Sequence, residues 1–241
     1  MDLCQLIFPV SYPGMKDCKS VLLIGSPGTC KTSLLLQMAS SLSHQSCKTL
    51  NSDDCTIMFI CNYQLTKIPL HVHRMPQFDA ISAKNISIQY LKTFGDLISH
   101  LANLFIHVGK LTGIIIDGID NFLKTIDEKV DGNYKDCLAK LFALLVDLGG
   151  HYSDCQDGFV GGDPCPIVAS FDSNDEDINE KVLISSIGNH FFEQVAKIEP
   201  CTILGTRLGF KMTDSSDHCI YYYIDEGQIY LDRISKIKLI Y

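Results

Sequence analysis

The sequence contains no long hydrophobic run: no segment approaches the ~20 consecutive apolar residues that a membrane-spanning helix needs. Residues 1–6 have neither the basic start nor the apolar stretch of a secretory signal peptide. These absences exclude the usual sequence signals of membrane insertion and secretion, so we expect a soluble intracellular protein.

The cysteines form no C-x-x-C pair, and their number, 11, is odd. Neither a disulfide framework nor a zinc knuckle is therefore indicated. Two looser pairs, Cys55 with Cys61 and Cys155 with Cys165, leave a metal site open, but buried or free thiols are the favoured interpretation.

Arginine is scarce, because the chain has only Arg74, Arg207 and Arg233, and the formal net charge is −8. Proteins that hold nucleic acid through their own surface are usually basic. Any contact with DNA must therefore be local, weak or shared with a partner. The apolar content, 46% of 241 residues, is sufficient for a full core, and we expect one α/β domain over residues 1–241.

A glycine-rich turn follows the apolar run 21–24 and precedes a second apolar segment. The turn consists of Gly25, Ser26, Pro27, Gly28, Thr29, Cys30, Lys31 and Thr32. This is the P-loop pattern, in which backbone N–H groups surround phosphate oxygens and the next helix points its positive end at them. Lys31 is placed to reach the β- and γ-phosphates of ATP, and the Thr32 hydroxyl to ligate Mg²⁺.

One position of the turn departs from the pattern, since Cys30 stands where glycine is expected. A side chain held in a glycine conformation costs about 1–3 kcal/mol. It also adds bulk where the backbone should approach phosphate. We therefore expect the site to be kept and its affinity to be lowered.

A second apolar run, residues 111–116, ends in Asp117. In P-loop proteins the strand beside the P-loop strand ends in such an aspartate, which holds Mg²⁺ through water. Asp117 is thus the predicted Walker B residue, and Lys31 and Asp117 are the predicted catalytic residues. Asp120 is interpreted as a turn or N-cap residue.

Apolar segments with strand and helix periodicity alternate along the chain. Strands are expected at 21–24, 56–61, 86–90 and 167–171, and helices at 31–42, 94–105 and 138–148. Residues 43–54 are expected to be a polar connector, 62–83 irregular and 149–166 a loop. Residues 219–224 and 228–234, separated by Asp-Glu-Gly, predict a hairpin. The pattern predicts a mostly parallel sheet with helices on both faces and a C-terminal antiparallel β-hairpin.

At this point the chain resembles RecA-like P-loop ATPases of the Rad51-paralogue type, and among them the ATPase that accompanies a SWIM-domain zinc protein in homologous recombination. The segments that carry the resemblance are residues 25–32, 86–90, 114–120, 144–147, 151–153, 168–169 and 189–192. The resemblance implies an ATP- and Mg²⁺-dependent ATPase, stimulated by single-stranded DNA, in DNA repair. It also implies a nuclear location, a SWIM-domain partner and contacts to Rad51-type recombinases and paralogues.

Several positions depart from the family pattern. RecA-like enzymes usually carry a glutamate after the second strand, whereas here Cys61 is followed by Asn62, Tyr63 and Gln64. Because a general base contributes about 10²–10⁴-fold, weak hydrolysis is expected; Gln64 and Asp120 are the candidates for orienting water. The strand at 167–171 ends without an evident γ-phosphate sensor, and no Phe-x-x-Ala tether occurs, which favours a mediator over a filament former.

The sequence gives only local indications of where single-stranded DNA would be contacted. Arg233, Lys236 and Lys238 gather near the C-terminus, and Tyr221, Tyr222 and Tyr223 resemble the aromatic residues on which bases stack. The favoured alternative is a terminal strand with solvated lysines, whose tyrosines belong partly to the core. Two functions stay open: a slow ATPase of recombination, and a pseudo-ATPase scaffold that stabilises a partner.

Overall fold

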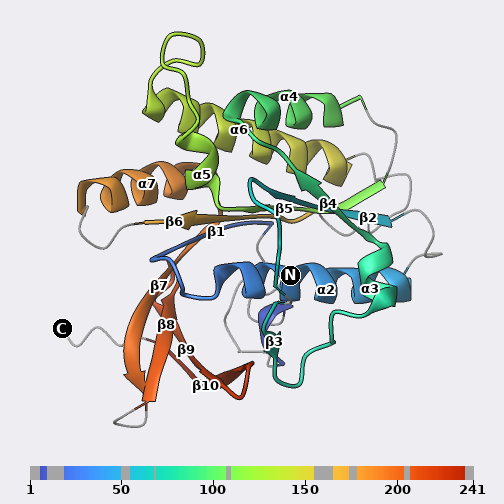
Figure 1. Cartoon of the computed structure of the whole chain (residues 1–241), viewed down its shortest axis with the longest axis vertical. Coiled ribbons are helices and arrows are strands. Elements are labelled where there is room, and N and C mark those ends of the chain that lie inside the picture. The colour runs from blue at the N-terminus through green and yellow to red at the C-terminus, as the bar shows by residue number, and fades with distance from the viewer. Residues whose placement is uncertain are drawn as a thin grey trace.

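The computed structural model describes residues 6–9, 19–49, 55–67, 69–106, 110–154, 165–173, 178–203 and 207–236. A ten-stranded sheet forms its centre, in the order β3-β10-β9-β8-β7-β1-β6-β5-β2-β4 (Figure 1). The strands are β1 (Ser20–Gly25), β2 (Cys55–Cys61), β3 (His71–Val72), β4 (Ile86–Tyr90), β5 (Lys110–Asp117), β6 (Ile167–Asp172), β7 (Gln194–Ile203), β8 (Arg207–Thr213), β9 (His218–Asp225) and β10 (Gln228–Lys236). The helices are α2 (Lys31–Thr49), α3 (Ala80–Lys84), α4 (Phe94–Leu104), α5 (Ile119–Leu123), α6 (Tyr134–Asp154) and α7 (Ile178–Phe191).

The parallel part of the sheet runs from β7 through β1, β6, β5 and β2 to β4. β1 and β6 are almost continuously apolar and buried, as expected for strands covered on both faces. Helices α4 to α7 cover one face, and α2 and α3 lie on the other (Figure 1). Each face has its own hydrophobic core cluster. No helix in the described part of the chain is long and apolar enough to cross a membrane.

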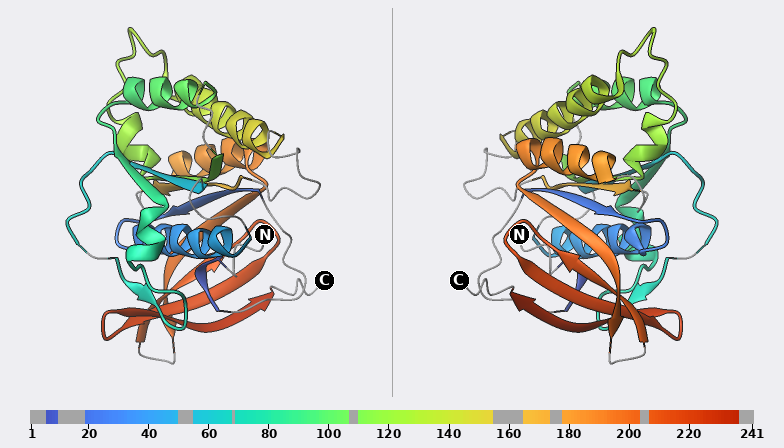
Figure 2. Two further views of the ribbon diagram at one scale, coloured as in Figure 1. Left: turned by 90° about the vertical axis from the view of Figure 1, so that its right-hand side faces the viewer. Right: turned by 90° about the vertical axis from the view of Figure 1, so that its left-hand side faces the viewer.

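The C-terminal strands β7 to β10 pair antiparallel. Figure 2 shows that this part of the sheet curls around α2, so that the helix lies between the central strands and β8 to β10. Phe210, Tyr222 and Ile229 accordingly belong to the same core cluster as the apolar face of α2. The predicted hairpin is confirmed as β9 and β10, and so is the predicted fold class.

Helix α2 is longer than predicted, since it continues to Thr49 where a connector was expected from residue 43. The reason is that its buried serines find partners in facing segments. The Ser41 hydroxyl donates to the Leu6 carbonyl at 2.8 Å, and the Ser43 hydroxyl donates to the Ser82 carbonyl at 3.1 Å. Polar side chains that are satisfied in this way can lie on a buried helix face.

Two other segments that were expected to be irregular contain helices or strands. Residues 62–83 include β3 and the start of α3, and α6 continues to Asp154, which lies inside the loop expected at 149–166. The rest of that loop, residues 155–164, lies outside the described residues, as does Cys155. Free thiols in the described part of the chain include Cys30, Cys61, Cys137, Cys165, Cys201 and Cys219.

Candidate nucleotide-binding site

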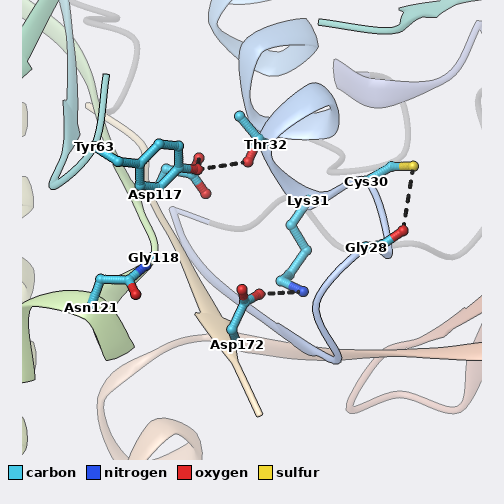
Figure 3. A pocket seen from close by; sticks show the side chains of 9 residues that line it. All are labelled: Gly28, Cys30, Lys31, Thr32, Tyr63, Asp117, Gly118, Asn121 and Asp172. Carbon is cyan, nitrogen blue, oxygen red and sulfur yellow. Dashed lines mark hydrogen bonds and ion pairs between the residues drawn. The ribbon is translucent and has the colours of Figure 1, made fainter. Parts of the chain in front are cut away.

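A pocket of about 220 Å³ lies where β1, β5 and β6 end and α2 begins. It is smaller than the roughly 300–1,000 Å³ usual for ligand pockets. Its lining consists of Gly28, Cys30, Lys31, Thr32, Tyr63, Asp117, Gly118, Asn121 and Asp172 (Figure 3). The carboxyl ends of parallel strands are the usual place for ligands in such sheets.

The turn from Gly25 to Cys30 has the conformation that a P-loop requires. A Cβ atom on Gly25 would lie 2.7 Å from the Ile198 carbonyl oxygen, so only glycine fits there. Gly28 has φ +84° and Cys30 has φ 63°. Cys30 thus adopts the left-handed conformation that favours glycine, as its place in the pattern predicted. The N–H of Leu34 donates to the Cys30 carbonyl at 3.0 Å, which closes the first turn of α2.

Lys31 is buried at the floor of the turn, and its ammonium group has four neighbours. It donates to the carbonyls of Gly25 (2.8 Å) and Ser26 (2.7 Å) and to the Thr29 hydroxyl (2.9 Å). It also forms an ion pair with Asp172, at 2.7 Å between Nζ and Oδ1. The Asp172 carboxylate therefore contacts the lysine that the P-loop pattern places to reach phosphate.

The predicted metal ligands Thr32 and Asp117 face each other across the pocket, and Tyr63 lies between them (Figure 3). The Tyr63 hydroxyl donates to Asp117 Oδ2 at 2.5 Å and lies 2.9 Å from Thr32 Oγ1. Hard oxygen donors of this kind are the ones that Mg²⁺ prefers. The donor set of Thr32 and Asp117 therefore fits the metal that the sequence predicted.

The expected neighbour relation of the two motif strands is wrong, because β6 lies between β1 and β5. Ser170 of this intervening strand donates from its hydroxyl to Asp117 Oδ1 at 2.7 Å. The same hydroxyl accepts from the N–H of Gly118 at 2.9 Å. The inserted strand thus supplies a contact that orients the Asp117 carboxylate.

Asp120 is not the N-cap of α5, since that position belongs to Gly118, and it lies in the first turn of the helix. Its buried carboxylate accepts from the N–H of Asp172 at 3.0 Å and pairs with Lys124 at 2.7 Å. Neither Asp120 nor Gln64 lines the pocket. The two residues considered for orienting water therefore lie outside it.

Burial raises the pKa values of one hydroxyl and two thiol groups in and beside the pocket. Burial and the neighbouring Asp117 carboxylate raise the pKa of the Tyr63 hydroxyl well above its ordinary value. Burial raises the pKa of Cys61 to about 11 and also raises the pKa of Cys30, although Lys31 acts in the opposite direction there. These groups stay protonated at neutral pH, so Tyr63 is a hydrogen-bond donor to Asp117.

The other P-loop residues shape the turn. The Thr29 hydroxyl donates to the Ser26 carbonyl at 2.9 Å, and Pro27 is exposed at the tip. The pocket residues that the sequence analysis did not assign to the site are Tyr63, Gly118, Asn121 and Asp172. One feature of the sequence pointed to Tyr63, because it lies two residues after β2, where RecA-like enzymes usually carry a catalytic glutamate.

The tyrosines of β9 divide between two faces. Tyr222 is buried, and its hydroxyl donates to the Thr29 carbonyl at 2.9 Å, which links β9 to the P-loop. Tyr221 and Tyr223 point to the other face, where the guanidinium groups of Arg233 and Arg207 lie 4.3 and 4.6 Å from their respective ring centres. Tyr222 is therefore no candidate for stacking on bases, and Lys238 lies outside the described residues.

Neither a protein-family model nor a curated protein matches the sequence. Solved structures of other proteins share its fold, and two of them serve as examples. A KaiC-like protein from Pyrococcus horikoshii OT3 has a TM-score of 0.55 at 12% identity, and the match covers 89% of each chain. The flagellar accessory protein FlaH from Methanocaldococcus jannaschii has a TM-score of 0.56 at 11% identity, with 96% of this chain and 95% of that chain covered. The chain therefore has the RecA-like α/β fold that its sequence predicted.

Proposed function

We propose that this chain binds ATP with Mg²⁺ in the pocket at the start of α2 and hydrolyses it slowly. One observation carries the proposal: Lys31, Thr32 and Asp117 converge on a single pocket beside a turn with P-loop conformation. A helix N-terminus attracts phosphate through its free N–H groups and its dipole. Here α2 supplies this end, and its first residue is Lys31.

Each residue has a distinct part in binding. Lys31 exchanges Asp172 for phosphate oxygens, and Thr32 and Asp117 hold the metal, directly and through water respectively. The Mg²⁺ that these residues would hold would neutralise charge on the β- and γ-phosphates. Ser170 keeps the Asp117 carboxylate oriented through its 2.7 Å hydrogen bond.

Slow turnover is expected because a tyrosine follows β2 where RecA-like enzymes usually carry a glutamate as general base. The segment after β2 supplies Tyr63 to the pocket and no carboxylate. A protonated phenol cannot take a proton from the attacking water, so the base contribution of about 10²–10⁴-fold is lost.

A pseudo-ATPase scaffold is the second candidate. It is favoured by the fact that Lys31, Thr32 and Asp117 each contact another side chain of the pocket. In this alternative the pocket is a structural element, and the protein acts by stabilising a partner.

On the sequence resemblance we further propose a role in homologous recombination, in the nucleus, with a SWIM-domain zinc protein and Rad51-type recombinases or paralogues. Single-stranded DNA is the proposed stimulus of hydrolysis. Tyr221 and Tyr223, which face away from the core beside Arg233 and Arg207, are the proposed contact. A small surface of this kind suits the weak or shared contact that a chain of net charge −8 allows.

The test is ATP binding by isothermal titration calorimetry and phosphate release, with and without single-stranded DNA. Lys31→Ala should weaken ATP binding at least about tenfold, because it removes hydrogen bonds from a charged donor, and should abolish turnover. Lys140→Ala, an exposed residue of α6 with the same change in charge, is the matched control and should behave as wild type.

The outcomes separate the two candidates. Turnover that persists in Lys31→Ala would assign the activity to a contaminant. If the folded wild-type protein binds no ATP, the pseudo-ATPase scaffold becomes the supported function. Co-purification of Lys31→Ala with a SWIM-domain partner would then show whether that interaction depends on the nucleotide site.

A further inference from the structure

Tyr63 has an unusual place in the pocket. Its hydroxyl lies within hydrogen-bond distance of both side chains that are placed to hold the metal, Thr32 at 2.9 Å and Asp117 at 2.5 Å (Figure 3). The two contacts join segments that are 31 and 54 residues away along the chain. Tyr63 therefore links the P-loop side of the pocket to the Asp117 side.

These contacts use the oxygen atoms that a metal would need. Asp117 Oδ2 accepts from Tyr63, and Asp117 Oδ1 already accepts from Ser170. Mg²⁺ requires six oxygen ligands at about 2.0–2.1 Å in near-ideal octahedral geometry. A phenol between Thr32 and Asp117 takes the space in which that shell must form.

The surroundings of Tyr63 allow its side chain to move while its backbone stays in place. The preceding residue is fixed, because the Asn62 side-chain amide donates to the Lys92 carbonyl at 2.6 Å. The Cys61 thiol lies 3.2 Å from the Tyr63 carbonyl. Tyr63 itself is 37% exposed, so rotation of its side chain carries the ring towards solvent without rearranging the sheet.

We propose that Tyr63 is a positioning residue that competes with Mg²⁺ for Thr32 and Asp117 and thereby sets how strongly nucleotide binding depends on the metal. The inference rests on the proposed nucleotide site. With the ring in place, nucleotide is held mainly by the P-loop and Lys31. Binding together with Mg²⁺ requires the ring to turn outward, which reduces the affinity that the metal adds.

The experiment compares wild type with Tyr63→Phe, which removes only the hydroxyl. Dissociation constants for ADP and ATP are measured calorimetrically in EDTA and in excess Mg²⁺. Tyr90→Phe is the matched control, since it removes an exposed hydroxyl at the end of β4, the strand beside β2. Circular dichroism establishes that the variants are folded.

We expect Tyr63→Phe to change the affinity in EDTA less than the affinity in excess Mg²⁺, because the hydroxyl contacts Thr32 and Asp117, the side chains placed to hold the metal. The factor by which Mg²⁺ strengthens binding should rise about tenfold, as expected for removal of a competing hydrogen bond to a carboxylate. Tyr90→Phe should match wild type in both buffers.

Mg²⁺ could strengthen nucleotide binding by the same factor in wild type and Tyr63→Phe, or by a smaller factor in the variant. Either result would overturn the inference about Tyr63 and leave the proposed function in place. The second of these results would mean that the hydroxyl supports the metal. Absence of nucleotide binding by both folded proteins in both buffers would overturn the proposed function and the inference with it. Binding in EDTA therefore tests the site, and the effect of Mg²⁺ tests the role of Tyr63.

Discussion

Cys30 stores conformational strain in the P-loop, since its φ of 63° belongs to the region that side chains other than glycine rarely occupy. Because the strain lies in the folded backbone, it lowers the free energy of unfolding. The effect of Cys30 on affinity then depends on its bulk beside the phosphate-facing turn.

Replacement of this residue separates the two effects. Cys30→Gly should raise the free energy of unfolding by about 1 kcal/mol, the low end of the strain at such positions because glycine also gains freedom in the unfolded chain. We also expect tighter ATP binding. Cys30→Val, which is β-branched, should destabilise. Urea unfolding and calorimetry measure both quantities, and a Cys30→Gly protein with unchanged affinity would show that the loop has adapted to cysteine.

Asp172 pairs with Lys31 in the same pocket and would compete with phosphate in the proposed nucleotide site. The side chain is 35% exposed, so solvent screens the pair in part. Asp172→Asn keeps the shape and the backbone contact to Asp120 but removes the competing charge. ATP affinity should therefore rise about threefold to tenfold.

The matched control for this variant is Asp225→Asn, because Asp225 pairs with Arg207 at 3.2 Å away from the pocket and carries the same charge. Equal shifts in both variants would attribute the effect to net charge. Weaker ATP binding in Asp172→Asn would mean that Asp172 assists the site.

At the scale of elements, β9 is joined to the P-loop through one buried hydroxyl, that of Tyr222 on the Thr29 carbonyl. The contact explains why the C-terminal strands matter to a site formed by β1 and α2. It also places a core tyrosine next to the loop of the proposed nucleotide site.

Removal of that hydroxyl gives a test. Tyr222→Phe should lower the free energy of unfolding by about 1 kcal/mol, because it leaves a buried carbonyl without its donor. It should also weaken ATP binding. Tyr223→Phe, on the opposite face of the same strand, should change neither. Chemical unfolding monitored by circular dichroism measures the stability of both variants. Equal stability of Tyr222→Phe and Tyr223→Phe would contradict the argument.

At the scale of the whole molecule, α2 is held between the two parts of one curved sheet. A chain that ends at Ile203 loses β8 to β10 and with them the cover of that helix. The buried side chains lost are Phe210, Met212, Ile220, Tyr222 and Ile229. Each contributes about 1.5–3 kcal/mol by burial, which together rivals the 5–15 kcal/mol total stability of a typical protein.

The shortened chain should therefore show no cooperative thermal transition, while the full chain melts in one. Differential scanning calorimetry distinguishes the two. A sharp transition in the shortened chain would show that the C-terminal strands are dispensable for folding.

Local patterns were the most informative part of the sequence. The turn from Gly25 to Thr32 and the run ending at Asp117 lie as predicted, because each depends on neighbouring residues only. The end of α2 was misjudged, since Ser43, just beyond the predicted end at residue 42, donates to the Ser82 carbonyl, which is far away along the chain. The place of β6 was also missed, because strand order depends on how whole elements pack.

The sequence by itself determined the RecA-like order of elements, the glycine-like conformation at Cys30 and the lack of a carboxylate after β2, since these follow from local spacing. Only the tertiary structure decided what fills the pocket. Tyr63 and Asp172 reach Asp117 and Lys31 because the ends of β2, β5, β6 and β1 meet at one edge of the sheet. No periodicity within a segment records that meeting, so the contacts of Tyr63 with Asp117 and of Asp172 with Lys31 became visible only in the folded chain.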